Sequence, residues 1–167
     1  MWKSEFDDRV RGAILPRVSN KIVAPKNMRQ PSRDLETFPN PNPQRDYTIS
    51  FETSEFTCLC PKTGQPDFAT IRVQYIPDEL CVELKSWKLY LWSFRNEGGF
   101  HEAITNKILD DLVAATRPRW AHIEGDFNIR GGIHTTVLVS YEADEGAQAP
   151  QDAVPTKTAK AGKNKRK

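Results

Sequence analysis

Residues able to do chemistry are concentrated between positions 55 and 70, where two cysteines, a lysine and an aspartate share one short stretch. The turn-forming residues of this stretch are Pro61, Gly64 and Pro66. They exclude a regular helix or a central strand, so a loop is predicted. Because a thiolate is a strong nucleophile and a nearby carboxylate can move its proton, we predict Cys60 as a nucleophile and Asp67 as its acid–base partner. A purely structural role for both residues is the alternative.

Two lysines one helical turn apart form a candidate binding surface. The apolar residues at helical spacing in positions 83–95 are Leu84, Trp87, Leu91 and Phe94. They predict a helix whose apolar stripe faces the core, with Asp78 as its N-cap. Lys85 and Lys88 then share another face of the helix, where they can hold a phosphate-bearing ligand or form an ordinary solvated surface.

His101 and Glu102 stand at the start of a second predicted helix, residues 100–116. The helix dipole stabilises a carboxylate at this end, and such a carboxylate can accept two hydrogen bonds from a guanine-like edge. The pair therefore predicts either a purine-binding group or ordinary helix-start chemistry. His122 and His134 fall within strand patterns and are expected to be sheet residues.

The three cysteines, Cys58, Cys60 and Cys81, raise the question of a zinc site. Structural zinc sites favour two to four residues between paired cysteines, and Cys58-x-Cys60 has only one. We therefore predict a metal-free thiol. No glycine-rich fingerprint follows a predicted strand, so any nicotinamide cofactor has to bind without a Rossmann fold.

Composition fits one soluble domain: the 167 residues are 38% hydrophobic and 28% charged. No apolar run approaches the roughly 20 residues that cross a bilayer, and the N-terminus lacks the order of a signal peptide, so a cytoplasmic protein is predicted. Residues 156–167 hold six basic side chains and no acid, which out of a net charge of +2 leaves −4 on the rest. A nucleic-acid-binding face on the body of the protein is therefore not expected.

The predicted elements divide the chain into three parts. Residues 1–45, rich in Pro, Asn, Arg and Ser, are predicted as an irregular N-terminal arm, and residues 143–167 as a flexible basic tail. Between them, residues 46–142 form the predicted catalytic domain. Its strands are predicted at 47–53, 68–76, 120–127 and 133–141, with a hairpin turn at 130–132 before the last. The ββααββ order predicts an α+β fold with an antiparallel sheet and both helices on one face, and its open edges predict association of several copies into a barrel.

Four motifs follow one another in a fixed order and spacing. They are Glu-Phe-Thr-x-Leu-Cys-Pro-Lys-Thr-Gly-Gln-Pro-Asp-Phe-Ala from Glu55, Glu-Leu-Lys-Ser-Trp-Lys-Leu-Tyr from Glu83, Phe-Arg-Asn from Phe94 and Phe-His-Glu from Phe100. Over residues 39–141 the chain resembles the QueF family, NADPH-dependent 7-cyano-7-deazaguanine reductases of the single-domain type. The second motif distinguishes this family from GTP cyclohydrolase I, which shares its tunnelling fold.

The resemblance implies a four-electron reduction of the nitrile of 7-cyano-7-deazaguanine to the primary amine, with two NADPH and no metal. The product, 7-aminomethyl-7-deazaguanine, is a precursor of the tRNA nucleoside queuosine. Cys60 matches the family's nucleophile, which adds to the nitrile carbon to give a covalent thioimide. Asp67 matches its proton donor.

The resemblance also assigns binding residues and partners. The substrate-binding positions are matched by Val82, Glu83, Leu84, His101 and Glu102, with Glu102 anchoring the purine-like edge. The NADPH-contacting positions are matched by Lys85, Lys88 and Arg130. A ring-shaped homo-oligomer of two stacked pentamers is implied, with active sites between subunits, a small 7-deazapurine as substrate, and neither a membrane nor a nucleic-acid partner.

Two other functions are compatible with the residues. One is a zinc-dependent, GTP cyclohydrolase-like enzyme on the same fold, which bound zinc would favour. The other is a non-catalytic purine- or RNA-binding module, suggested by the basic residues at 156–167.

Overall fold

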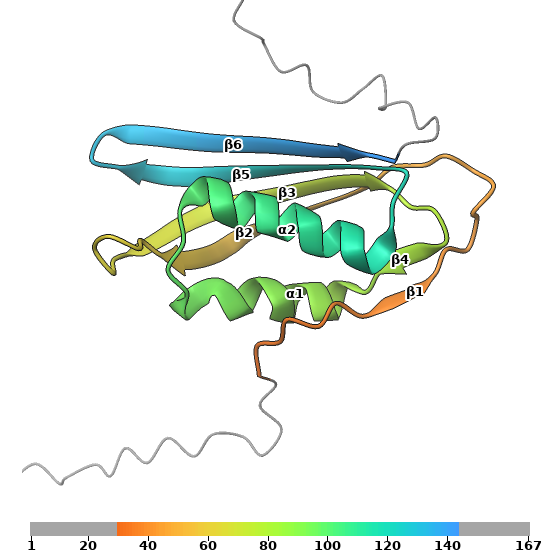
Figure 1. Ribbon diagram of the computed structural model, residues 1–167, viewed down its shortest axis with the longest axis horizontal. Helices are drawn as coiled ribbons and strands as arrows, with labels where there is room; N and C mark the ends of the chain where they lie inside the picture. Colours follow the sequence, from red (N-terminus) through yellow and green to blue (C-terminus); the bar gives the residue numbers. More distant parts are fainter. Residues whose placement is uncertain (1–29, 144–167) are drawn as a thin grey trace, which may run out of the picture.

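A four-stranded antiparallel sheet carries two helices on one of its faces (Figure 1). In this computed structural model residues 30–143 are described; residues 144–167 of the predicted tail and residues 1–29 of the predicted arm lie outside them. The sheet has the order β2-β3-β5-β6, and its strands are β2 (Ile49–Leu59), β3 (Pro66–Ile76), β5 (Trp120–Arg130) and β6 (Ile133–Glu142). The helices are α1 (Leu84–Trp92), continued by a 3₁₀ turn (Ser93–Asn96), and α2 (His101–Thr116). The predicted ββααββ order and α+β class are confirmed.

The strands are longer than predicted, and the first one enters the cysteine stretch. β2 continues through Cys58 to Leu59, paired with Asp67 and Pro66 of β3. The loop therefore shrinks to residues 60–65, and the prediction of a loop from residue 55 was wrong. The pairing of β2 with β3 changes register between Thr53 and Phe56, so the long strand is irregular at this point. Pro66 is tolerated because it begins its strand.

Two short strands were not predicted. β1 (Thr37–Pro39) pairs antiparallel with β4 (Leu80–Val82) beside the start of α1. Asn40 secures this corner, since its side-chain amide donates to the carbonyl of Asp78 at 2.6 Å. Part of the predicted irregular arm is thus paired into a sheet. A three-residue strand has too little alternation to be read from sequence, because its partner lies far along the chain.

The start of α1 differs from the prediction. Asp78 is not the N-cap, because β4 intervenes, and its carboxylate instead accepts a hydrogen bond from Arg119 at 3.1 Å. The cap is Glu83, whose two carboxylate oxygens accept from the backbone N–H groups of Lys85 and Ser86 at 2.9 and 2.7 Å. A glutamate in this place satisfies two of the unpaired amides of the first turn.

The predicted apolar stripe of α1 is correct except at its first position. Trp87, Leu91 and Phe94 are buried, whereas Leu84 is 59% exposed. Leu84 is the first residue of the helix, and the sheet does not reach over it. The helical spacing alone could not show at which residue the buried part of the stripe begins.

The core lies between the sheet and the two helices, with α2 packed against β5 and β6. Gly125 of β5 permits a close approach: a Cβ there would lie 2.6 Å from the hydroxyl oxygen of the fully buried Thr105. Neither helix of residues 30–143 is long and apolar enough to span a membrane.

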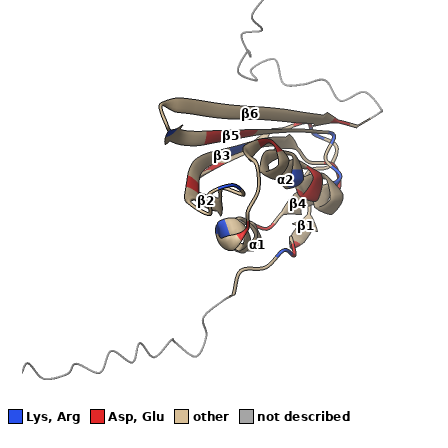
Figure 2. Ribbon diagram, turned by 60° about the vertical axis from the view of Figure 1, so that its left-hand side comes forward, with Lys and Arg blue, Asp and Glu red and all other residues tan. Residues whose placement is uncertain are grey.

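The opposite face of the sheet is polar. Arg72 of β3 lies between acids of the neighbouring strands, donating to Glu52 at 2.7 Å and to Glu124 at 2.8 Å. Figure 2 shows the alternation of basic and acidic segments across β2, β3 and β5. His122 and His134 lie in β5 and β6, as predicted, and bond to Ser140 and Asp126.

Candidate active site

Cys60 follows β2 directly and begins a loop closed by its own backbone. Its N–H donates to the carbonyl of Gln65, and its carbonyl accepts from the N–H of Gly64, both at 2.8 Å. Gly64 has φ +69°, which glycine adopts without strain. The thiol is 8% exposed, at the surface end of the core. The loop therefore holds Cys60 in one place.

Strand periodicity puts the candidate nucleophile and its partner on one face. Side chains two residues apart on a strand point the same way, so Cys58 and Cys60 both face the helices. Asp67 is the direct cross-strand partner of Cys58 and is only 7% exposed. Cys60 and Asp67, predicted as a pair, therefore lie on the same side of the sheet.

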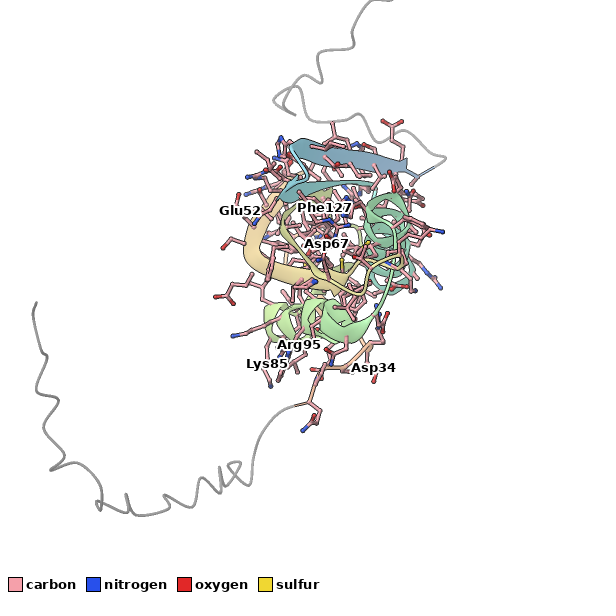
Figure 3. The ribbon with its side chains drawn as sticks, turned by 90° about the vertical axis from the view of Figure 1, so that its left-hand side faces the viewer. Asp34, Glu52, Asp67, Lys85, Arg95 and Phe127 are labelled. Atoms are coloured by element: carbon pink, nitrogen blue, oxygen red, sulfur yellow. The ribbon has the colours of Figure 1, made fainter. Side chains whose placement is uncertain are left out.

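Arg130 and His101 complete a cluster around Asp67. The guanidinium of Arg130 donates from Nη2 to the sulfur of Cys60 at 3.0 Å and from Nη1 to the carboxylate of Asp67. His101 Nε2 lies 3.4 Å from the other carboxylate oxygen. The imidazole stacks on Phe127, with ring centroids 3.8 Å apart. Figure 3 views this end of the molecule, with Asp67 and Phe127 between the sheet and the helices.

The two neighbouring thiols have opposite electrostatic environments. The pKa of Cys60 is lowered to about 6 by hydrogen bonds from the side chains of Thr63 and Arg130 and from the backbone amides of Lys62 and Thr63. The pKa of Cys58 is raised to about 11, first by burial and then by the negative charges of Asp67 and Cys60. Only Cys60 is therefore a thiolate near neutral pH, which is the reactive form.

The predicted substrate residues fall into two groups within one copy of the chain. His101 and Glu102 begin α2 at the end where Cys60 lies, with Glu102 exposed. Val82, Glu83 and Leu84 join β4 to α1 at the opposite end of the sheet (Figure 1). There they line a small pocket of about 340 Å³ against β2. One copy does not bring the two groups together.

The predicted cofactor residues are likewise separated. A groove of about 690 Å³ runs between the exposed edge of β2 and α1, and Lys88, Trp92 and Arg95 line it. Lys85 is exposed on α1 outside the lining of this groove, and Arg130 belongs to the Cys60 cluster. Cations beside an apolar wall suit a nucleotide with phosphates. The indole N–H of Trp87 is buried without a hydrogen-bond partner among residues 30–143.

Two contacts of the cluster were missed by sequence reasoning. Thr63, whose side chain helps to lower the pKa of Cys60, could have been suggested by its place in the same turn. Phe127 could have been suggested by the alternation that turns it inward on β5. No group of three or more potential metal ligands is assembled within residues 30–143.

Comparison with known proteins gives a consistent family. A family model described as "QueF-like protein" matches residues 66–146. An NADPH-dependent 7-cyano-7-deazaguanine reductase of Alkalilimnicola ehrlichii is 63% identical over 122 residues, covering 73% of this chain and 95% of the relative. A protein of the same name from Anaeromyxobacter sp. strain K is 71% identical over 112 residues, covering 67% and 92%. One from Nitrosococcus oceani is 61% identical over 122 residues, covering 73% and 94%.

A solved structure supports the fold. The apo form of an archaeosine synthase described as QueF-Like aligns with a TM-score of 0.54 at 20% identity, covering 57% of this chain and 94% of that one. At this identity the likeness concerns the fold, which agrees with the predicted tunnelling-fold unit. With relatives above 60% identity over nearly their whole length, the chain belongs to the QueF family.

Proposed function

We propose that this protein reduces the nitrile of 7-cyano-7-deazaguanine to the primary amine in the cytoplasm, using two NADPH, on the route to queuosine. The observation that carries the proposal is the pairing of a low-pKa thiol, Cys60, with the buried carboxylate of Asp67 in a chain of this family. Reduction of a nitrile benefits from such a pair, because a free nitrile accepts hydride poorly whereas a protonated thioimide accepts it well.

In the proposed mechanism the sulfur of Cys60 attacks the nitrile carbon. The carbon–sulfur bond forms as one carbon–nitrogen π bond breaks, and Asp67 delivers a proton to the nitrogen. NADPH, when bound, supplies hydride to the resulting carbon. After the first reduction, collapse of the hemithioaminal expels Cys60 as a thiolate and leaves an imine for the second. The lowered pKa of Cys60 favours two steps of this mechanism: the attack, which needs the thiolate, and the expulsion, because a stable thiolate leaves readily.

Glu102 is proposed to bind the purine-like edge of the substrate. Its position at the first turn of α2 stabilises the carboxylate and places it one residue from His101, which contacts Asp67. Val82, Glu83 and Leu84 are proposed to contact the substrate from a second copy, since they lie at the far end of their own sheet.

NADPH is proposed to bind across Lys85 and Lys88, whose charges suit its phosphates, with Arg130 approaching from the end where Cys60 lies. The groove beside Lys88 has a volume that fits a nucleotide, and its wall combines apolar side chains with the cations Lys88 and Arg95 on the α1 side and the acids Glu52 and Glu55 on the β2 side. No metal is required by the proposed chemistry, because Asp67 protonates the nitrogen.

Association into a ring, with two stacked pentamers as the proposed state, would complete each site. The outer strands β2 and β6 are open edges of the sheet. Large apolar side chains are exposed on or beside the sheet strands: Phe68 at 53%, Ile129 at 70%, Ile133 at 70% and Leu138 at 43%. Open edges with exposed apolar side chains favour pairing with another copy.

The deciding experiment follows NADPH oxidation by the purified full-length chain with 7-cyano-7-deazaguanine, and the product mass in the same reaction. Two NADPH oxidised per amine formed is the expected result, with Cys60→Ala inactive. No oxidation, together with zinc in the purified protein, would instead support the cyclohydrolase alternative.

A further inference from the structure

Arg130 contacts both members of the proposed acid–base pair. It ends β5 at the turn into β6, where Gly131 and Gly132 take φ of +61° and +80°. This turn projects the guanidinium over the sheet end. One arm donates to the sulfur of Cys60 at 3.0 Å and the other to the carboxylate of Asp67. The side chain is 44% exposed and reaches the cluster from outside.

The geometry points to Arg130 as the residue that holds Cys60 as a thiolate in the free enzyme, in addition to any contact with cofactor. A guanidinium offers donors in a rigid fork, and here the fork spans a sulfur and a carboxylate that belong to different strands. A residue that served only the cofactor would have no need to contact either.

The charges around the sulfur explain what the fork does. The titratable groups that face Cys60 are Arg130 from β5, Asp67 from β3 and Cys58 from β2, while His101 of α2 faces Asp67. Asp67 and Cys58 both disfavour a negative sulfur when they are charged, and Arg130 is the cation in contact with it. The guanidinium therefore offsets a repulsion that the fold itself creates between Cys60 and Asp67.

A proton that moves from the sulfur of Cys60 to the carboxylate of Asp67 leaves the net charge of the pair unchanged but moves its negative charge to the sulfur. Arg130 contacts both groups and is therefore beside the negative charge before and after the transfer. When the sulfur then bonds to the nitrile carbon, the nitrogen takes that proton from Asp67. The sulfur ends neutral, and Arg130 keeps only its ion pair with Asp67. The hydrogen bond from Arg130 to the sulfur of Cys60 is thus expected only before the adduct forms.

The test is the pH profile of Cys60 alkylation by iodoacetamide in a Cys58→Ser background, which needs neither substrate nor NADPH. Arg130→Gln keeps much of the shape but no charge, and Arg130→Lys keeps the charge but not the fork. Arg45→Gln is the matched control, because Arg45 is an exposed arginine between β1 and β2 that belongs neither to the Cys60 cluster nor to the lining of the groove. Intact circular dichroism and an unchanged melting temperature would establish that each variant folds.

Loss of the charge in Arg130→Gln is expected to move the alkylation midpoint upward by about one unit, so that the rate at pH 5.5 falls roughly tenfold. Arg130→Lys should recover part of the rate, and Arg45→Gln should match the parent. An unchanged midpoint in Arg130→Gln would overturn the inference. The mechanistic part rests on the proposed function, but the alkylation result does not: a shifted midpoint in a protein that fails to reduce the nitrile would leave Arg130 assigned and the reaction wrong.

Discussion

The imidazole of His101 lies flat on the ring of Phe127, with centroids 3.8 Å apart and planes 6° apart. The first residue of α2 is thereby fixed against β5, and Nε2 is directed at Asp67 at 3.4 Å. The ring that orients the histidine is itself buried. The orientation of His101, which lies against the proposed proton donor Asp67, thus depends on core packing.

Phe127→Leu should remove the flat surface and allow the imidazole to turn. We expect nitrile reduction to slow about tenfold, while KM for NADPH stays unchanged and stability falls by about 1–2 kcal/mol. Phe56→Leu is the matched control, since Phe56 is equally buried but packs on Phe94. Steady-state rates and thermal unfolding of both variants separate orientation from stability. Equal slowing in Phe56→Leu would assign the whole effect to packing.

Cys60→Ala should abolish the covalent adduct and turnover while substrate still binds. Cys58→Ser should retain most activity, because that buried thiol has its pKa raised to about 11 and is not a thiolate at neutral pH. Intact-mass measurement after incubation with 7-cyano-7-deazaguanine detects the adduct directly. An inactive Cys58→Ser enzyme with normal folding would show that the wrong sulfur was chosen.

The rate of adduct formation should fall as the pH is lowered below neutrality. The pKa of Cys60 is lowered from its ordinary value to about 6, so the thiolate is present above pH 6 and is lost as the pH falls through that value. The rate of adduct formation without NADPH should therefore fall about tenfold per pH unit below 6. A midpoint near the ordinary thiol value, above pH 8, would contradict the hydrogen-bonded environment of the sulfur.

Lys88→Ala should raise KM for NADPH by about tenfold with a smaller effect on adduct formation, because the lysine lies in the groove along α1 and not in the Cys60 cluster. The same change at Lys107, an exposed lysine of α2 paired with Asp111 at 3.0 Å, is the control and should leave KM unchanged. Rates at varied NADPH give both values. Equal KM in the two variants would remove the groove from the proposal.

Gly125→Ala tests the close packing of α2 on β5. The added Cβ would lie 2.6 Å from the side chain of Thr105, so we expect a loss of about 1–3 kcal/mol in the free energy of unfolding. Gly98→Ala is the control, because its Cβ would find no atom closer than 3.6 Å. Chemical denaturation of both variants measures the difference. Similar midpoints would mean that the helix shifts to accept the methyl group.

Periodicity predicted the helices and strands that show a pattern of apolar residues in their own sequence. The apolar spacing of residues 100–116 gave α2 to within one residue, and Arg130-Gly-Gly gave the β5–β6 turn. The β1–β4 pair was missed because each strand depends on a distant partner. The position of Asp78 just after a strand-breaking proline predicts a helix cap, and only the fold shows that Arg119 binds its carboxylate instead.

The residues of the candidate site were predicted individually, but the contacts between them were not. Family resemblance named Cys60, Asp67 and His101, and the fold brings these three together. It also named Arg130 for the cofactor, which stays a prediction, and the fold adds a contact between this side chain and the sulfur of Cys60. That contact joins the ends of two hairpins, and nothing local in the sequence of either specifies it.

For protein engineering, the loop of residues 60–65 offers variable positions next to a fixed sulfur. The backbone amides of Lys62 and Thr63 help to lower the pKa of that sulfur, and they remain whatever side chain Lys62 carries. Pro61, Lys62 and Gln65 are exposed and add nothing to the core. A library at these three positions can therefore be screened for altered nitrile selectivity while the backbone that activates the thiol is kept.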